Sequence, residues 1–282
     1  MAEPATPYIF DNSDEREAER LAGIQAAFDP GTFRHLAELG VGEGWRCLEV
    51  GAGAGSVAKW LCERVGEKGS VVATDINTVL IDDLDLPNLE VRQHDLQTED
   101  LPKGEFDLVH TRLVLIHLPA REEILRRLAD ALAPGGWLLV EDISIEGAGT
   151  STWRGTAAFK GLLAPLKAMF KAHGADHGFA RRLPVLVNRL GLADVGAEGR
   201  VVVLIGGTDS IAWALPTVDR IQDRLVGDAG TSKAQAAFER VPALRRAVDA
   251  QIVRLRRLLD DPEFAAFCPA LVAAWGRRPP AP

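Results

Sequence analysis

The residues best suited to chemistry form a short glycine-rich stretch. Three glycines, Gly51, Gly53 and Gly55, alternate with alanines directly after an apolar run. Glycine lets the backbone turn sharply, and it lets a ligand approach without a Cβ in the way. Turns of this kind bind nicotinamide dinucleotides, nucleoside triphosphates and S-adenosylmethionine, so the surrounding residues must distinguish between these ligands.

Three acidic residues stand around this loop, each near the end of an apolar run. Glu49 comes two residues before the first glycine, where a carboxylate is costly to bury unless it meets a donor or a cation. Asp75 follows the first glycine by 24 residues, a position from which an acidic side chain can bind both ribose hydroxyls of an adenosine. Asp95 could accept a hydrogen bond from an adenine amino group, with Ile76 and Leu96 packed on the faces of the ring.

Each of these features also has a structural interpretation. Glycines occur in turns that serve packing alone. Asp75 could be the N-cap of a helix that begins at the next residues. Asp95 could close an Asx turn that leads into residues 97–102. The combination of a glycine loop with acidic residues at three strand ends is nevertheless hard to explain by packing.

The same stretch lacks what a phosphate ligand requires. No lysine follows the glycines in the order GxxxxGK[ST], and Glu49 would repel a pyrophosphate. The dinucleotide spacing GxGxxG fails as well, because Ser56 stands where the last glycine should be. A sulfonium that carries an amino acid end suits these carboxylates better, so the residues favour S-adenosylmethionine.

The elements that must position these residues alternate between short strands and amphipathic helices. Strands are predicted at residues 45–50, 70–76, 89–96, 106–112 and 137–143. Helices are predicted at 56–66, with Gly66 as the C-terminal cap, and at 120–133. Strand–helix–strand units at this spacing give right-handed crossovers and a parallel sheet, and ligands bind at the carboxyl edge of such a sheet.

Helical patterns flank this core. They cover residues 14–28, 32–39, 155–174, 180–191 and 211–260. Residues 199–207 are predicted to be a sixth strand, and residues 263–279 a last strand. We therefore predict an N-terminal helical cap at 1–40, a cofactor-binding core at 41–150, a helical lid insertion at 151–198, and the remaining strands with a further helical insertion at 199–282.

Five successive segments resemble the motifs of the class I S-adenosylmethionine-dependent methyltransferases. They read CLEVGAGAGSVAKWL, ATDI, RQHDL, FDLVHTRLVLIHLP and LAPGGWLLVEDI, and together they cover about residues 45–143. The N-terminal stretch is also similar to the leader of a group of actinobacterial small-molecule methyltransferases. The resemblance implies an α/β fold with a Rossmann-like seven-stranded sheet, whose last strand is antiparallel and inserted beside the sixth.

The resemblance also implies roles for particular residues. The glycine loop at 51–55 would pass beneath the methionine part of S-adenosylmethionine. Asp75 would hold the ribose and Asp95 the adenine. His110, near the end of the fourth strand, would line the methionine side.

The chemistry of the transfer adds further candidates. Methyl transfer is an in-line displacement that depends on positioning, and a hydroxyl nucleophile also needs a base. His117 is the most plausible base by residue type, although a core or capping histidine is the alternative. Arg112 could pair with an anionic substrate or with the cofactor carboxylate. Tyr8 could fold over the cofactor or simply anchor the terminal segment. Glu141 and Asp142 face either the pocket or solvent.

Composition disfavours several classes of partner. The chain has 40 acidic and 32 basic residues and a net charge of -8, whereas nucleic-acid binding depends on clustered lysine and arginine. No apolar run approaches the roughly 18 residues that span a bilayer, and the acidic N-terminus has no apolar signal core, so we expect a cytoplasmic protein. The three cysteines stand in apolar patterns and are interpreted as buried thiols: Cys47, Cys62 and Cys268.

The sequence does not predict a metal site. His173 and His177 lie four residues apart beside Asp176, but glycines interrupt the helix that this spacing would need. The arginines of the stretch at 245–257 share a helical pattern with leucines and are interpreted as its solvated face.

We therefore expect an enzyme that methylates a small, largely apolar metabolite, with oxygen as the favoured acceptor and a natural product as the favoured substrate class. A homodimer is possible. Candidate pocket residues are the large apolar side chains of the flanking helices: Trp153, Phe159, Met169, Phe170 and Trp213. Four alternatives stay open: N- or C-methylation, a pericyclase-like enzyme that uses the sulfonium charge without transfer, a non-catalytic binding protein, and a nicotinamide oxidoreductase.

Overall fold

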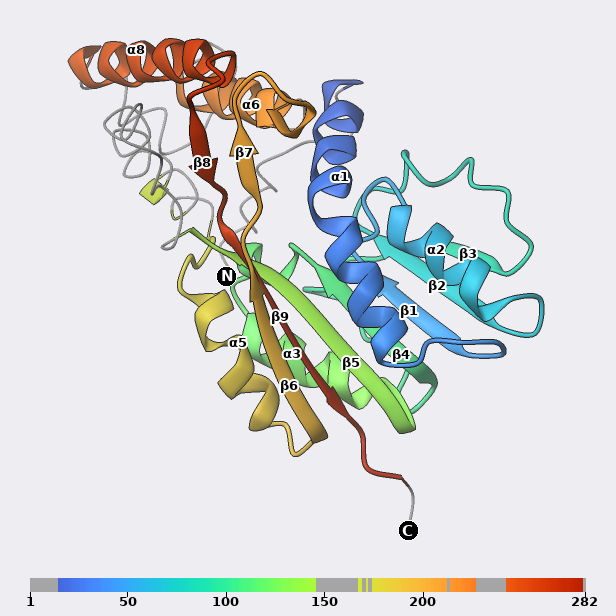
Figure 1. Cartoon of the computed structure of the whole chain (residues 1–282). Helices are drawn as coiled ribbons and strands as arrows, with labels where there is room; N and C mark the ends of the chain where they lie inside the picture. The colour runs from blue at the N-terminus through green and yellow to red at the C-terminus, as the bar shows by residue number, and fades with distance from the viewer. Residues whose placement is uncertain are drawn as a thin grey trace.

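In the computed structural model, seven strands of the described chain form a central sheet in the order β3-β2-β1-β4-β5-β9-β6 (Figure 1). The description covers residues 15–145, 167–168, 171, 174–211, 214–226 and 242–280. Several residues that the sequence singled out lie outside these ranges: Tyr8, Trp153, Phe159, Met169, Phe170, His173 and Trp213.

The first five strands lie close to where the sequence predicts them. Their bounds are Arg46–Val50 for β1, Ser70–Asp75 for β2, Leu89–Gln93 for β3, Phe106–Arg112 for β4 and Leu132–Ser144 for β5. β1 pairs in parallel with β2 and β4, β2 with β3, and β4 with β5. Chain order reverses at β1, because β2 and β4 lie on either side of it, and ligands of open parallel sheets bind at the carboxyl ends of strands around such a point.

The last strand confirms the predicted sheet. β9, Ala270–Arg277, lies between β5 and β6 and is antiparallel to both of them. The segment predicted as this strand, 263–279, is divided, since its first part forms a separate strand, β8, at Ala265–Phe267.

The prediction for the sixth strand was wrong. β6 is Ala193–Arg200, so the predicted segment at 199–207 overlaps it only at its first two residues. Val203–Ile205 of that segment form β7, which pairs with β8 in a two-stranded sheet. β6 reads ADVGAEGR, which carries little β-propensity, and its pairing with β9 holds it in the sheet. Gly196 fits closely there, because a Cβ would lie 2.5 Å from the ring of Trp275.

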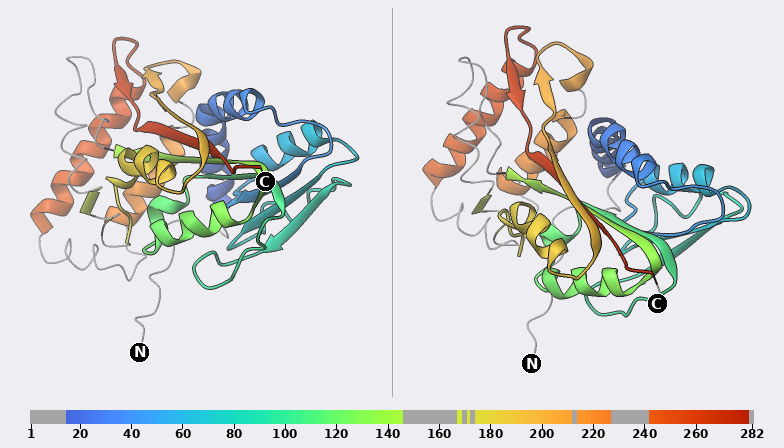
Figure 2. Two further views of the ribbon diagram at one scale, coloured as in Figure 1. Left: turned by 90° about the horizontal axis from the view of Figure 1, so that it is seen from below. Right: turned by 60° about the horizontal axis from the view of Figure 1, so that its bottom comes forward.

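Helices cover both faces of the sheet. Their bounds are Glu15–Glu38 for α1, Ser56–Val65 for α2, Arg121–Asp130 for α3, Phe179–Asn188 for α5, Ala214–Val226 for α6 and Pro242–Leu259 for α8. α1 and α2 lie on one face, and α3 and α5 lie on the other (Figure 2). α6, α8 and the β7–β8 sheet lie beyond the end of the main sheet at which β5 ends (Figure 1). Two short 3-10 helices complete the described elements: η1 at Leu115–His117 and η3 at Asp209–Ile211.

α2 follows the glycine loop and confirms its predicted cap. Val57, Leu61 and Val65 recur at intervals of four residues and are buried against the sheet. Gly66 ends the helix with a φ of 63°, and its N–H donates to the carbonyl of Cys62. Glycine is favoured in that left-handed conformation because it has no Cβ.

The two helices predicted at 14–28 and 32–39 are a single helix, α1, with Pro30 inside it. Proline removes a helix hydrogen bond and usually breaks a helix, at a cost of about 3 kcal/mol. Contacts on both sides of Pro30 hold α1 together here. Asp29 and Thr32 bind a sheet arginine, and the ring of Phe33 stacks on Trp60 of α2 at a centroid distance of 5.3 Å.

The three cysteines are buried and unpaired, as predicted: Cys47, Cys62 and Cys268. Burial raises the pKa of each thiol, to about 11 for Cys62 and about 12 for Cys268. They therefore stay protonated at neutral pH, and a protonated thiol is a poor nucleophile.

Candidate functional site

The glycine loop connects the carboxyl end of β1 to α2. Its three glycines have φ values of +73°, +56° and +77°, which side chains rarely adopt. The N–H groups of Gly51 and Ala52 donate to the carbonyl of Thr74 at 2.8 and 3.0 Å, which ties the loop to β2. The loop therefore lies between the two strands that carry Glu49 and Asp75.

Two of the three glycines are also required by packing within the protein. A Cβ on Gly51 would lie 2.2 Å from Cγ2 of Val114, and a Cβ on Gly55 would lie 2.8 Å from Cδ1 of Leu84. At Gly53 a Cβ would meet only the side chain of Leu21, at an ordinary 3.6 Å. Gly53 is thus the position where nothing in the described chain fills the space close to the backbone.

Asp75 ends β2 and faces the loop. Its Oδ2 accepts the N–H of Gly53 at 2.9 Å, and its Oδ1 accepts the N–H of Asn77 at 3.1 Å. Burial raises the pKa of this carboxyl, and the backbone donors oppose that rise. The residues directly after Asp75, at 76–88, form turns and irregular backbone rather than a helix, so the N-cap alternative was wrong. The next side chain, Ile76, is 50% exposed.

Asp95 forms the Asx turn that the sequence offered as its alternative. Its Oδ1 accepts the N–H of Gln97 at 2.9 Å, and its Oδ2 accepts the hydroxyl of Thr98 at 3.1 Å. Each carboxylate oxygen has a further lone pair, so the turn leaves acceptor capacity for a ligand. Leu96 is buried in the hydrophobic core with residues of α3.

A buried chain of charged side chains crosses three strands next to the loop. Glu49 and His110 are register partners on β1 and β4, and Oε2 of Glu49 lies 2.5 Å from Nδ1 of His110. Nε2 of His110 lies 3.3 Å from Oε2 of Glu141 on β5. None of these residues is more than 2% exposed.

The protonation states of Glu49, His110 and Glu141 depend on one another. Burial alone would lower the pKa of His110, but the two carboxylates outweigh it and raise the pKa to about 9, so the ring is a cation at neutral pH. Burial raises the pKa of Glu49, and His110 counteracts that rise. Burial would also raise the pKa of Glu141, but hydrogen bonds from His110 and His35 hold it well below its usual range.

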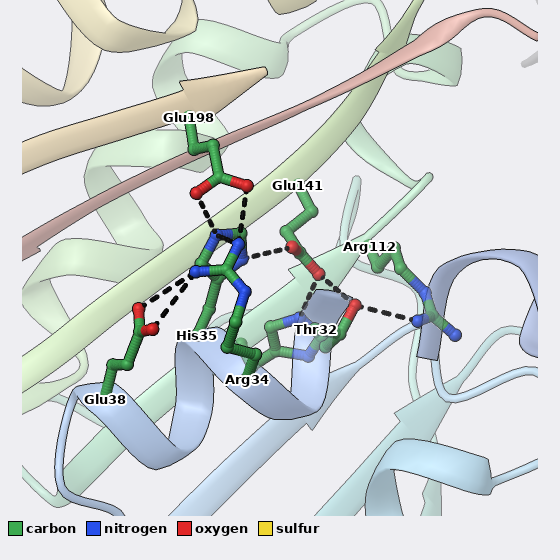
Figure 3. A network of polar contacts seen from close by, with 8 residues as sticks. Thr32, Arg34, His35, Glu38, Arg112, Glu141 and Glu198 are labelled. Carbon is green, nitrogen blue, oxygen red and sulfur yellow. Dashed lines mark hydrogen bonds and ion pairs between the residues drawn. The ribbon is translucent and has the colours of Figure 1, made fainter. Parts of the chain in front are cut away.

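Helix α1 supplies the other half of the network (Figure 3). The hydroxyl of Thr32 donates to Oε2 of Glu141 at 2.5 Å, and Nδ1 of His35 lies 3.1 Å from Oε1 of the same carboxylate. The hydrogen bond to Glu141 outweighs burial and raises the pKa of His35. At the exposed end of the network, Arg34 bridges Glu38 and Glu198.

Arg112 is held between the sheet and α1. Its Nη1 donates to Oγ1 of Thr32 at 2.9 Å and its Nη2 to Oδ1 of Asp29 at 2.8 Å (Figure 3 shows the Thr32 contact). Asp29 also accepts the hydroxyl of Ser56, the first residue of α2, at 3.1 Å. The side chain of Arg112 is 9% exposed, and two of its donors already bind α1.

His117 ends η1, the 3-10 helix after β4, and is half-buried. Burial and the positive charge of Arg20 lower its pKa to about 4, so the imidazole is neutral at physiological pH. Asp142 fixes the preceding residue, since its Oδ2 accepts the N–H of Ile116 at 2.8 Å. Asp142 and Glu141 are fully buried, so neither is a solvated strand-end carboxylate.

Sequence reasoning missed the contribution of α1 to this site. Asp29, Thr32 and His35 were not singled out, and they lie far along the chain from their partners on β4 and β5. A signal was nevertheless present. Thr32 and His35 follow the buried Phe28 by four and seven residues, which places two polar side chains on the apolar face of the helix.

The described residues contain no group of three or more His, Cys, Asp or Glu that could hold a metal ion. They also contain no helix that is long and apolar enough to cross a membrane.

Residues 13–174, a stretch longer than half of the chain, match the family model described as a methyltransferase domain. The sheet order and the position of the glycine loop are those of this class. The chain therefore belongs to the methyltransferase domain family.

Relatives and solved structures agree with this assignment. Methyltransferase str2 of Strobilurus tenacellus is 31% identical over 175 residues, which are 61% of this chain and 62% of that protein. UbiE of Pseudomonas fluorescens, a ubiquinone/menaquinone biosynthesis C-methyltransferase, is 32% identical over 168 residues, 51% of this chain and 66% of that protein. The chain thus spans less than two thirds of either relative. Phosphoethanolamine N-methyltransferase 2 of Haemonchus contortus shares the fold, with a TM-score of 0.55 at 15% identity over 99% of this chain and 62% of that one.

The methyl donor of this family is S-adenosylmethionine, and the residues at the carboxyl edge fit it. Gly53 leaves room beside its backbone, since a Cβ there would meet only Leu21, at 3.6 Å. Glu49, which contacts His110, and Asp75 are acidic side chains at this edge, whereas a sulfonium and an ammonium are positively charged. Ile76, directly after Asp75, is a half-exposed apolar side chain.

Proposed function

We propose that this protein transfers the methyl group of S-adenosylmethionine to a hydroxyl of a small, largely apolar metabolite. The observation that carries the proposal is the arrangement of Glu49, the glycine loop and Asp75 around the point where strand order reverses. Secondary metabolites are the proposed substrate class and the cytoplasm is the proposed compartment. The buried, unpaired thiols support a reducing compartment.

The cofactor would lie along the carboxyl ends of the first three strands. The loop at 51–55 would pass beneath its methionine part, and Glu49 would face the ammonium, with His110 behind it. Asp75 would accept the ribose hydroxyls, and Asp95 would accept the adenine amino group. Among the ring contacts, half-exposed Ile76 is better supported than buried Leu96. Tyr8, which lies outside the described residues, is proposed as part of a lid over this site.

The bound cofactor supplies an electrophilic methyl on a good leaving group, and the protein must orient the acceptor and manage its proton. Neutral His117, beside the end of β4, can accept a hydroxyl proton as the methyl is transferred. Arg112 would contribute a remaining N–H to a cofactor or substrate carboxylate, since two of its donors bind α1. Helix α6 is proposed to cover the acceptor, together with the part of the expected lid at 151–198 that precedes α5.

C-methylation is the second candidate. The relative UbiE is named as a C-methyltransferase, and a stabilised carbanion needs positioning but no strong base. The low pKa of His117, about 4, makes it a weak base and fits such a reaction as well. The product distinguishes the two: a methyl ether supports the first candidate and a new carbon–carbon bond the second.

The decisive experiment uses cofactor labelled in the methyl group. The purified protein is incubated with it and with a panel of phenols, quinols and amines, and labelled product and S-adenosylhomocysteine are measured. We expect labelled methyl ethers from the phenols. Binding of the cofactor without any transfer would favour a pericyclase-like or binding role, and absence of binding in calorimetry would contradict the proposal altogether.

A further inference from the structure

The buried network joins the proposed cofactor site to α1 through one residue, Glu141. Its carboxylate receives the hydroxyl of Thr32 at 2.5 Å, Nδ1 of His35 at 3.1 Å and Nε2 of His110 at 3.3 Å. Figure 3 shows Thr32 and His35 reaching it from the helix below the strand. A fully buried carboxylate is stable only with such donors around it.

His110 connects Glu141 to Glu49 through contacts of its two ring nitrogens. The imidazole lies between the two carboxylates, with one ring nitrogen directed at each. A rotation of the ring would leave buried charges without partners, which is strongly unfavourable. The ring is therefore fixed, and its contact with Oε2 at 2.5 Å holds the carboxylate of Glu49 in one orientation. Burial raises the pKa of Glu49, and the positive charge of His110 opposes that rise.

We propose that Glu141 is a positioning residue for cofactor binding: through His110 it holds the Glu49 carboxylate in the orientation that faces the amino acid end of the cofactor. This inference rests on the proposed function, in which Glu49 faces the ammonium. The same carboxylate binds α1 through Thr32 and His35, and α1 places Leu21 beside Gly53. The position of α1 and the proposed recognition of the amino acid end of the cofactor thus both depend on the buried carboxylate of Glu141.

Two ligands separate this role from a general structural one. S-adenosylhomocysteine carries the amino acid end, whereas 5′-methylthioadenosine shares the adenosine and the thioether but lacks that end. Glu141→Gln keeps the shape of the side chain and removes its charge. In calorimetry we expect its affinity for S-adenosylhomocysteine to fall about tenfold, the loss of roughly one charge-assisted interaction. We expect the affinity for 5′-methylthioadenosine to change less than about twofold, which is within the range of indirect effects. Equal losses for both ligands, or none, would overturn the proposal.

A double-mutant cycle tests whether Glu141 acts through Glu49. If it does, Glu141→Gln costs affinity in the natural protein and little in a Glu49→Gln background. Equal costs in the two backgrounds would overturn the proposal. Glu198→Gln is the matched control, because Glu198 is a partly exposed carboxylate 3.6 Å from the other nitrogen of His35. We expect it to leave both affinities unchanged.

A second variant covers the case in which Glu141→Gln does not fold. His35→Gln removes the imidazole whose Nδ1 contacts Glu141 and leaves the contact between Thr32 and Arg112 in place. A selective loss for S-adenosylhomocysteine would support the proposal, whereas no loss or equal losses would overturn it. A natural protein that binds neither S-adenosylmethionine nor S-adenosylhomocysteine would contradict the proposed function itself, so the two failures are distinguishable.

Discussion

Asp75→Ala tests the ribose assignment most directly. The carboxylate accepts the N–H groups of Gly53 and Asn77 at 2.9 and 3.1 Å, and a backbone hydrogen bond from Ile76 also favours its charged form. An ionised carboxylate has about four acceptor sites, so it can also accept a ribose hydroxyl. Hydrogen bonds to a charged group contribute about 1.5–3 kcal/mol each, and water replaces part of that when the carboxylate is removed. A net loss of about 2–4 kcal/mol corresponds to roughly 30- to 1,000-fold weaker binding of S-adenosylmethionine.

The loop contact complicates this experiment, because Asp75 also holds the N–H of Gly53. Calorimetry with a 2′-deoxy analogue of the cofactor resolves the two contributions. The natural protein should bind the analogue more weakly than the cofactor, and Asp75→Ala should bind both about equally. Asp82→Asn, an exposed carboxylate of the same segment, is the control. Affinity of Asp75→Ala within about twofold of the natural protein would refute the assignment, since a lost charged hydrogen bond exceeds that value.

Three further predictions follow from the geometry. His117→Ala should lower turnover about 100-fold, as for loss of a proton acceptor, with little change in cofactor affinity; equal losses in kinetics and calorimetry would indicate a structural role. Gly51→Ala should lower the free energy of unfolding by about 2–4 kcal/mol in urea titrations, because φ is +73° and its Cβ would clash with Val114. When Val114→Ala is added to Gly51→Ala, it should restore only the part of the unfolding free energy that the clash removed. A loss below about 1 kcal/mol for Gly51→Ala alone would contradict this reasoning. Burial raises the pKa of Asp142 to about 7. Since the unfolded carboxyl titrates near about 3.9, stability should fall as pH rises from about 4 to 7. Asp142→Asn should flatten that profile in thermal melts, and unchanged profiles would show that another group is responsible.

The parts of the fold that local pattern controls could be predicted from the sequence. β1, β2 and β4 are apolar runs bounded by turns, and α2 ends where Gly66 allows it. β6 could not be predicted, because ADVGAEGR has no strand pattern and pairing with β9 decides its conformation. The more hydrophobic segment after it forms β7 outside the main sheet. Tertiary pairing outweighed local propensity at that point.

The candidate site likewise has residues whose placement the sequence predicts and residues whose surroundings it does not predict. Gly51 to Gly55 and Asp75 stand close together in the sequence, so spacing alone places them at one strand edge. The surroundings of Glu141 depend on Thr32, which is 109 residues away, and on His35, which is 106 residues away. No local pattern reports which strand a helix will cross, so the sequence left the environment of Glu141 undecided between pocket and solvent.

The polar contacts of α1 explain why this helix belongs to the site rather than merely covering it. Apolar residues at Thr32 and His35 would pack against the sheet with less desolvation cost, and such replacements are often neutral for stability. Apolar packing by itself would, however, allow several positions of the helix along the sheet. Hydrogen bonds to Glu141 and the ion pair between Asp29 and Arg112 have a single geometry. That geometry places Leu21 beside Gly53, so the contacts that fix α1 also define the space next to the loop on which the cofactor is proposed to lie.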